Sequence, residues 1–342
     1  MKKIISINIF VLLLLLIIIE IIFGHWFKKD NFGIFMRSER NVKELITTEF
    51  NEKKYEFIYK RNFYAFRGDN FDASKVKIIF QGGSTGNQRF HPEDKTIVGQ
   101  LNKFFNKDNI GQKIYNASTD GKSTKGYIND FIFWFPKIPN FKPSIFIFYI
   151  GINDSICCPD WAKHYEYKAA DTLPKKIRDY IKNNSLIFGL ATKVSNKFFP
   201  KVVRSYWGNS QKTKNFKFIN YQDAKTNFSS RELNKKEKLI INAFKKRLIT
   251  LDNHIQKNKI IPIFITQIRS DGLKDYLLYG INNELKSFSK KNNYDLIPLD
   301  EIINNINTKD FYDYFHTTPS GSKKIAEGIY PILKDIILEK TN

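Results

Sequence analysis

Four side chains that together could carry out acyl transfer are spread along this chain of 342 residues. Attack on an ester carbonyl requires a nucleophile, a base that takes its proton, a group that orients the base, and hydrogen-bond donors for the oxyanion. Serine, histidine, aspartate and asparagine can fill these four roles. The residues concerned are Ser84, Asn153, Asp313 and His316.

Ser84 is the candidate nucleophile. It stands among Gly82, Gly83 and Gly86, and small residues allow a strand to turn sharply into a helix. The alternative is a glycine-rich turn in which the serine only caps a helix. The turn taken alone favours neither interpretation.

His316 is the candidate base. The chain has five histidines, and only His316 follows an aspartate by three residues and directly precedes a predicted helix. A turn there can bring the Asp313 carboxylate to the imidazole, where it fixes the tautomer and stabilises the imidazolium. A lone D-x-x-H in a loop usually has no function. Its position after the last predicted strand is what makes this pair a candidate.

Three donors are candidates for the oxyanion site. They are the side-chain amide of Asn153 and the backbone N–H groups of Ser84 and Gly121. The alternative for Asn153 is an Asx turn at the end of a strand, with Asp154 capping the segment after it. An ordinary turn explains Gly121 equally well.

The order of these pieces resembles the SGNH (GDSL-like) hydrolase superfamily. Its signature is a Ser, a Gly, an Asn and a His in that order, with the His three residues after an Asp. The resemblance covers residues 76–342. It implies a catalytic triad of Ser84, Asp313 and His316. It also implies an oxyanion site formed by Ser84, Gly121 and Asn153.

The sequence around Ser84 also satisfies the G-x-S-x-G elbow of α/β-hydrolases. That fold carries several strands and an oxyanion loop before the nucleophile. Here Ser84 follows the first predicted strand, and the close Asp–His pair favours the SGNH type. We therefore interpret the elbow match as a coincidence.

Short apolar runs separated by amphipathic helices predict the elements that position these residues. The run 144–150 is almost wholly apolar, as expected for a strand buried on both faces. Alternating strands and helices predict an α/β fold, a flavodoxin-like three-layer doubly wound parallel sheet with ligands outside the carboxyl ends of its strands. The five predicted strands are 76–80, 113–116, 144–150, 260–266 and 294–299.

Helix boundaries are indicated at several points. A capping box at residues 229–232 predicts the start of a long helix that continues to Ile255. The last helix is predicted to begin with Pro319 at its first position. The hydrolase-like domain is thus assigned to residues 75–342, and residues 24–74 are interpreted as a membrane-proximal linker.

Residues 155–230 interrupt the alternation and are too long for a plain connection. This stretch is basic and rich in aromatic residues, and we interpret it as an inserted subdomain beside the site. Its aromatic side chains either line one wall of the cleft, where they suit sugar rings, or form a small core of the insert itself. They include Trp161, Tyr165, Tyr206, Trp207 and Tyr221.

Residues 4–23 are almost wholly apolar and long enough to cross a hydrocarbon core of roughly 30 Å as a helix. A cleaved signal peptide is the alternative, but no A-x-A-like pair comes after the run, so an uncleaved transmembrane anchor is favoured. Two lysines precede the run and two follow it, so charge alone does not predict which end of the helix faces the cytoplasm. Because anchored members of the resembled superfamily commonly act on envelope components, the hydrolase domain is expected on the periplasmic or extracytoplasmic side.

Composition limits the partners. The net charge is +22, but lysines are spread along nearly the whole chain, which argues against a nucleic-acid partner and favours attraction to an anionic membrane or polymer. The two cysteines, Cys157 and Cys158, are neighbours and cannot form a disulfide framework or a four-ligand zinc site. No Walker loop, dinucleotide fingerprint, H-E-x-x-H or EF-hand is present, so neither a cofactor nor a metal is implied.

Together these features predict a membrane-anchored serine esterase that removes small acyl groups such as acetyl from an envelope glycan or polymer. Two alternatives use the same triad: an acyltransferase to a glycan, and a lipid esterase. A third alternative, from another class, is a catalytically inactive membrane-anchored glycan-binding protein.

Overall fold

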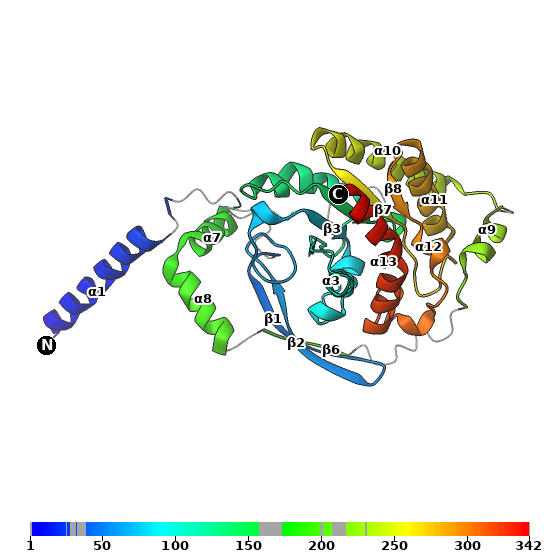
Figure 1. The fold of residues 1–342 in the computed structure, drawn as a ribbon. Coiled ribbons are helices and arrows are strands. Elements are labelled where there is room, and N and C mark those ends of the chain that lie inside the picture. The colour runs from blue at the N-terminus through cyan, green and yellow to red at the C-terminus, as the bar shows by residue number, and fades with distance from the viewer. Residues whose placement is uncertain are drawn as a thin grey trace. The chain divides into compact units, whose positions relative to one another are not determined.

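The computed structural model describes residues 2–24, 26–27, 32, 39–156, 173–198, 201–206, 217–229 and 231–341 (Figure 1). The chain divides into two units. The larger consists of Arg40–Glu166 and Val202–Asn342 and contains all the candidate site residues. The smaller consists of Met1–Glu39 and Tyr167–Lys201.

Five parallel strands form the central sheet of the larger unit. Their order is β4-β3-β5-β7-β8, which is the 2-1-3-4-5 order of flavodoxin-like folds and confirms the predicted fold class. Each strand overlaps its predicted run. The strands are β3 (Ile78–Gly82), β4 (Ile114–Asn116), β5 (Ile145–Tyr149), β7 (Ile261–Ile265) and β8 (Asp295–Ile297).

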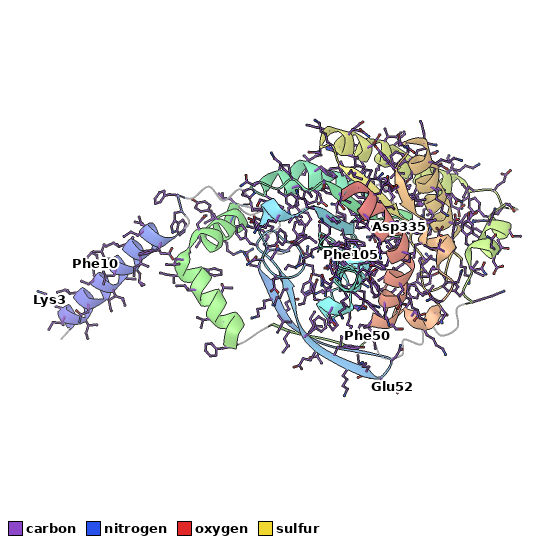
Figure 2. The ribbon with its side chains drawn as sticks, in the orientation of Figure 1. Lys3, Phe10, Phe50, Glu52, Phe105 and Asp335 are labelled. Carbon is purple, nitrogen blue, oxygen red and sulfur yellow. The ribbon has the colours of Figure 1, made fainter. Side chains whose placement is uncertain are left out.

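Helices cover both faces of this sheet, so β3 and β5 are buried over their whole length. On one side α3 packs against α13, and Phe105 of α3 is fully buried (Figures 1 and 2). In a second group of helices, α10 packs against α11 and against α4. The bounds are α3 Ile97–Lys107, α4 Thr124–Asn129, α10 Lys235–Lys257, α11 Tyr276–Lys291 and α13 Pro319–Thr341.

Shorter helices complete the unit. A π-helical turn over Asp130–Trp134 continues α4, and Pro319 is the first residue of α13, as predicted. The long helix α10 begins later than predicted. Its capping box is formed by Asn234 and Glu237, whereas Ser229 is the last residue of α9. The remaining short helices are α2 Ser84–Asn87, α5 Ile152–Ile156, α9 Tyr221–Ser229 and α12 Leu299–Ile302.

A second, antiparallel sheet precedes the first parallel strand. β1 (Val42–Phe50) and β2 (Lys53–Arg61) form a hairpin, and β6 (Lys201–Tyr206) lies next to β1. Residues 24–74 were expected to form a linker, and for residues 42–61 this prediction is wrong, because they form the paired strands of the hairpin. The buried positions of β1 alternate between polar and apolar residues, so no apolar period of two marks the strand. They are Glu44, Ile46, Thr48 and Phe50.

The hairpin turns at Asn51 and Glu52, both of which have positive φ, as two-residue hairpin loops require (Figure 2). The predicted insert 155–230 is described only in part. Trp161, Tyr165 and Trp207 lie outside the described residues. Tyr221 belongs to the larger unit, where its ring lies 5.8 Å from that of Tyr279 on α11.

The smaller unit contains three described helices. α1 (Lys2–Phe23) includes the apolar run, and residues 3–23 are long and apolar enough to cross a membrane. α7 (Leu173–Asn184) and α8 (Leu186–Phe198) follow each other around Ser185, and α8 contacts both α1 and α7.

Candidate active site

The candidate nucleophile begins the short helix after β3. β3 ends at Gly82, and Ser84 is the first residue of α2. Close approach requires the neighbouring glycines: a β-carbon on Gly83 would lie 2.2 Å from the Asn153 amide nitrogen, and one on Gly86 would lie 2.6 Å from the Ser118 hydroxyl. The turn therefore presents a half-buried Ser84 side chain at the carboxyl end of a central strand.

The structure brings Ser84, His316 and Asp313 into one hydrogen-bonded row. His316 Nε2 lies 2.7 Å from Ser84 Oγ, and His316 Nδ1 lies 2.7 Å from Asp313 Oδ2. The assigned proton positions follow from these partners, because the carboxylate can only accept: Nδ1–H donates to Asp313, and Nε2 accepts from the serine hydroxyl. This arrangement is the one that nucleophilic catalysis by serine requires.

The carboxylate of Asp313 is held in its charged form. Burial opposes ionisation, but hydrogen bonds from the His316 ring and from the backbone N–H groups of Phe315 and His316 outweigh it and lower the pKa of Asp313. The D-x-x-H spacing explains this geometry. The tight turn points the backbone N–H groups of Phe315 and His316 at the same carboxylate oxygen, Asp313 Oδ1. The ring of Tyr312 stacks on the imidazole at 5.6 Å, with the two rings nearly parallel.

Asn153 lies beside the nucleophile turn, at the start of α5. Its amide contacts the turn at Gly83, and one of its N–H groups donates to the Lys122 carbonyl at 2.7 Å. An amide nitrogen carries two hydrogens, and among the described residues the second has no acceptor. This hydrogen is available to an oxyanion formed next to Ser84.

The other two predicted donors are backbone groups. In the part of the chain that the structure describes, the N–H groups of Ser84 and Gly121 have no protein acceptor. Gly121 has a φ of 73°, in the left-handed region that favours glycine. The loop that contains it is tied to the end of β3, because Thr119 N–H donates to the Gly82 carbonyl.

Asp154 has a structural role, though not the local cap considered from the sequence. Its fully buried carboxylate accepts from the N–H and hydroxyl of Thr124, so it caps α4 across the fold. Arg247 on α10 forms an ion pair with the same carboxylate at 2.8 Å. Among the described residues, no group of histidine, cysteine and acidic side chains is placed to hold a metal.

Gln88 joins the nucleophile turn to the histidine loop, and sequence reasoning missed it. Its amide nitrogen donates to the hydroxyls of Thr317 and Ser322, while its carbonyl oxygen accepts from Ile97 N–H. The residue is buried in left-handed conformation. Its position four residues after Ser84 was the only available signal. Gln88 thus connects the segment that carries Ser84 with the segment that carries His316.

Arg61, the last residue of β2, is the second missed residue. Its buried guanidinium donates to the Ser118 carbonyl at 3.0 Å and to Asn87 Oδ1 at 3.1 Å, and it also reaches Thr119. These acceptors belong to α2 and to the loop that leads to Gly121. Arg61 therefore fixes the nucleophile helix relative to the loop of the oxyanion candidate.

We expect Arg61→Lys to lower kcat while leaving KM nearly unchanged. A lysine ammonium cannot span acceptors on two segments as a guanidinium does, and a shift of about 1 Å at a reacting centre can cost on the order of 10²-fold. Steady-state kinetics on an ester substrate measure the effect. Lys60→Ala, at an exposed neighbour on the same strand, is the matched control and should retain activity. Unchanged kcat in folded Arg61→Lys would contradict this positioning role.

Solved structures with a similar arrangement include esterases. TesA is 9% identical with a TM-score of 0.44, over 76% of this chain and 98% of that chain. A lipolytic protein of the G-D-S-L family from Desulfitobacterium hafniense DCB-2 is 11% identical with a TM-score of 0.43. The match covers 75% of this chain and 99% of that chain. Axe2, an acetyl xylan esterase from Geobacillus stearothermophilus, is 11% identical with a TM-score of 0.42, over 76% and 94%.

No protein-family model matches the chain, and no curated protein matches it. The side-chain contacts of Ser84, His316, Asp313 and Asn153 are what indicate a particular chemistry.

Proposed function

We propose that this protein is a serine ester hydrolase of the SGNH type. The observation that carries the proposal is the row of contacts in which His316 joins Ser84 Oγ and the Asp313 carboxylate, each at 2.7 Å. Ser, His and Asp side chains arranged in this way are the components of acyl-transfer catalysis. A binding protein would have no need for them in this order and geometry.

In the first half of the reaction, Ser84 Oγ attacks the acyl carbon as its proton passes to His316 Nε2. The imidazolium is stabilised by Asp313, whose low pKa keeps it ionised. The carbonyl oxygen becomes an oxyanion, which accepts hydrogen bonds from the Asn153 amide and from the N–H groups of Ser84 and Gly121. Collapse of the intermediate breaks the C–O bond, and the alcohol leaves with the proton from His316.

In the second half, water takes the place of the alcohol. His316 accepts a proton from this water as its oxygen attacks the acyl-serine ester, and the same donors hold the second oxyanion. Breakdown of this intermediate releases the carboxylic acid and returns the proton to Ser84. Transfer to a sugar hydroxyl would follow the same steps with a different acceptor.

The enzyme is proposed to be anchored in a membrane by α1, with the hydrolase domain on the extracytoplasmic side. The support is the length and apolar composition of residues 3–23, together with the exposure of their side chains in the structure. An enzyme held at a membrane acts on substrates that are present at that surface. The net charge of +22 favours anionic substrates among them.

We therefore propose that the substrate is a small acyl ester, such as acetyl, carried by an anionic envelope glycan or polymer. A short-acyl preference is expected in a series of esters of rising chain length, measured as kcat/KM on the full chain in lipid nanodiscs. Activity on an acetylated anionic polymer should fall as salt is raised, because screening weakens long-range attraction. An acetylated neutral polymer is the control and should show little salt dependence.

Two outcomes would count against this substrate class. A steep rise in kcat/KM with acyl length would indicate a lipid-binding groove and a lipid esterase. Equal salt dependence on neutral and anionic polymers would remove the charge argument. Neither outcome would affect the assignment of the triad, which predicts ester hydrolysis whatever the acyl group.

A further inference from the structure

Two helices within the predicted insert, α7 and α8, each expose an apolar stripe. On α7 the exposed apolar residues recur at helical spacing, and on α8 they do so again. Their exposures lie between 38% and 69%, which is unusual for large aliphatic side chains on helices that also carry polar faces. They are Leu173, Ile177 and Ile181 on α7, and Ile187, Leu190 and Val194 on α8.

A carboxylate near the end of the apolar helix α1 binds the N-terminus of α8. Glu20 accepts hydrogen bonds from Leu186 N–H at 3.0 Å and Ile187 N–H at 2.9 Å, and from the Ser185 hydroxyl. The N-terminus of a helix presents unpaired N–H groups and a partial positive charge, so it suits a carboxylate. These contacts explain how an acidic residue is accommodated within an otherwise apolar run.

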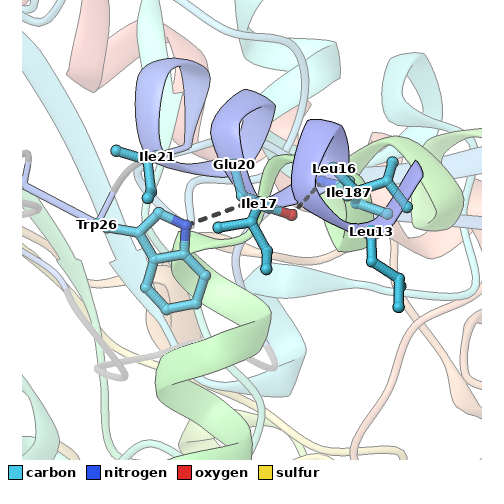
Figure 3. A pocket seen from close by; sticks show the side chains of 7 residues that line it. All are labelled: Leu13, Leu16, Ile17, Glu20, Ile21, Trp26 and Ile187. Carbon is cyan, nitrogen blue, oxygen red and sulfur yellow. Dashed lines mark hydrogen bonds between the residues drawn. The ribbon is translucent and has the colours of Figure 1, made fainter. Parts of the chain in front are cut away.

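The same carboxylate has a further partner just beyond the end of α1. Glu20 also accepts from the Trp26 indole N–H at 3.0 Å, and Figure 3 shows this bond beside the apolar side chains of α1 and Ile187. The Trp26 ring packs edge-on against Tyr180 of α7 at 5.7 Å. Tryptophan and tyrosine concentrate at the boundary between hydrocarbon and water. Both α7 and α8 are therefore tied to the end of α1 at which the chain would leave the bilayer.

We infer that α7 and α8 form an interfacial hairpin that lies in the headgroup region of the same bilayer that α1 crosses. The inference rests on the proposed membrane anchor. A helix of this kind places its apolar face among the upper acyl chains and carries Lys and Arg on its polar face. Residues 173–198 contain six Lys or Arg and one Asp, which complements anionic lipid headgroups.

The experiment places a fluorescent label at single cysteines in the full chain, with Cys157→Ser and Cys158→Ser as background. The labelled positions are Ile177→Cys and Val194→Cys on the apolar stripes. Thr192→Cys, exposed on the opposite side of α8, is the matched control. The proteins are reconstituted in vesicles of phosphatidylcholine and phosphatidylglycerol. Quenching is compared between lipids brominated near the glycerol end and iodide in the water.

Labels at residues 177 and 194 should be quenched several-fold more strongly by brominated lipid than the label at residue 192, and iodide should give the reverse order. Iodide quenching at 194 equal to that at 192 would overturn the hairpin assignment. Protection of 194 from both quenchers would also overturn it, because another protein surface would then cover the stripe.

A label at Leu14→Cys, near the middle of α1, is measured with lipids brominated near the methyl end of the acyl chain, because residue 14 of a membrane-spanning α1 would lie close to the bilayer centre. It separates failure of this inference from failure of the anchor. Lipid quenching at residue 14 without lipid quenching at 194 would reject the interfacial hairpin and leave the membrane anchor standing. Absence of lipid quenching at residue 14 would reject both. Hydrolysis by Ser84 is measured independently and would be unaffected by either result.

Discussion

Replacing Ser84 with alanine is expected to reduce ester hydrolysis by about 10⁴–10⁶-fold, because no other hydroxyl contacts His316 Nε2 in the described site. His316→Ala should give a loss of similar size. Residues of a triad act as a unit, so the double variant should be no worse than either single one. Steady-state rates on a small ester measure these losses.

The controls for this prediction are matched in residue type. Ser229→Ala and His254→Ala alter an exposed serine on α9 and a histidine stacked on Phe131 of the helical layer, and both should keep full activity. A serine-directed phosphonate should label Ser84 in the unmodified protein and not in Ser84→Ala. An unmodified Ser84 would favour the inactive binding protein, and full activity of Ser84→Ala would end the triad assignment. The loss of activity in Asp313→Ala should be smaller than the loss in Ser84→Ala or in His316→Ala.

Asn153→Ala is expected to lower kcat by about 10²–10³-fold with little change in KM. An oxyanion donor acts on charge that develops in the transition state, so ground-state binding is nearly unaffected. Asn153→Asp should be at least as damaging, because it removes the donor and adds a negative charge beside the oxyanion. Steady-state kinetics on the same small ester provide the measurement.

The amide of Asn153 also holds the Lys122 carbonyl, so a structural effect must be separated from a chemical one. Urea unfolding of both Asn153 variants gives the stability change. A loss of kcat that greatly exceeds any loss of folded protein supports the oxyanion role. A change confined to KM, or an activity loss that simply follows unfolding, would assign Asn153 to substrate contact or to packing instead.

The parallel sheet could be predicted because buried strands need uninterrupted apolar runs, and these stand out even in a sequence rich in Ile and Phe. β5, with every residue buried, was the strongest example. The Asp313–His316 contact was also predictable, because it is local and three residues span one turn. The contact of His316 with Ser84 joins positions 232 residues apart, and only the order of motifs indicated it.

Three other features could not be predicted from the sequence: strand β1, the role of Arg61 and the start of α10. β1 buries Glu44 and Thr48 between Ile46 and Phe50, so its inward face has no apolar period. The role of Arg61 could not be predicted, because arginines usually lie at the surface and nothing in the sequence indicates which acceptors surround this one. The cap of α10 was misplaced because S-x-x-E at 229–232 and N-x-x-E at 234–237 offer two similar signals, and α9 occupies the first.

The β1–β2 hairpin determines where a folded fragment of this protein can begin. By motif alone, a minimal catalytic fragment would start at residue 75, just ahead of β3. Such a fragment would keep the triad and lose Arg61, which holds Asn87 and the Ser118 carbonyl in place. A fragment starting at Arg40 keeps the hairpin. Residues 40–61 thus help to hold the turn that carries Ser84, although they contribute no side chain to the row formed by Ser84, His316 and Asp313.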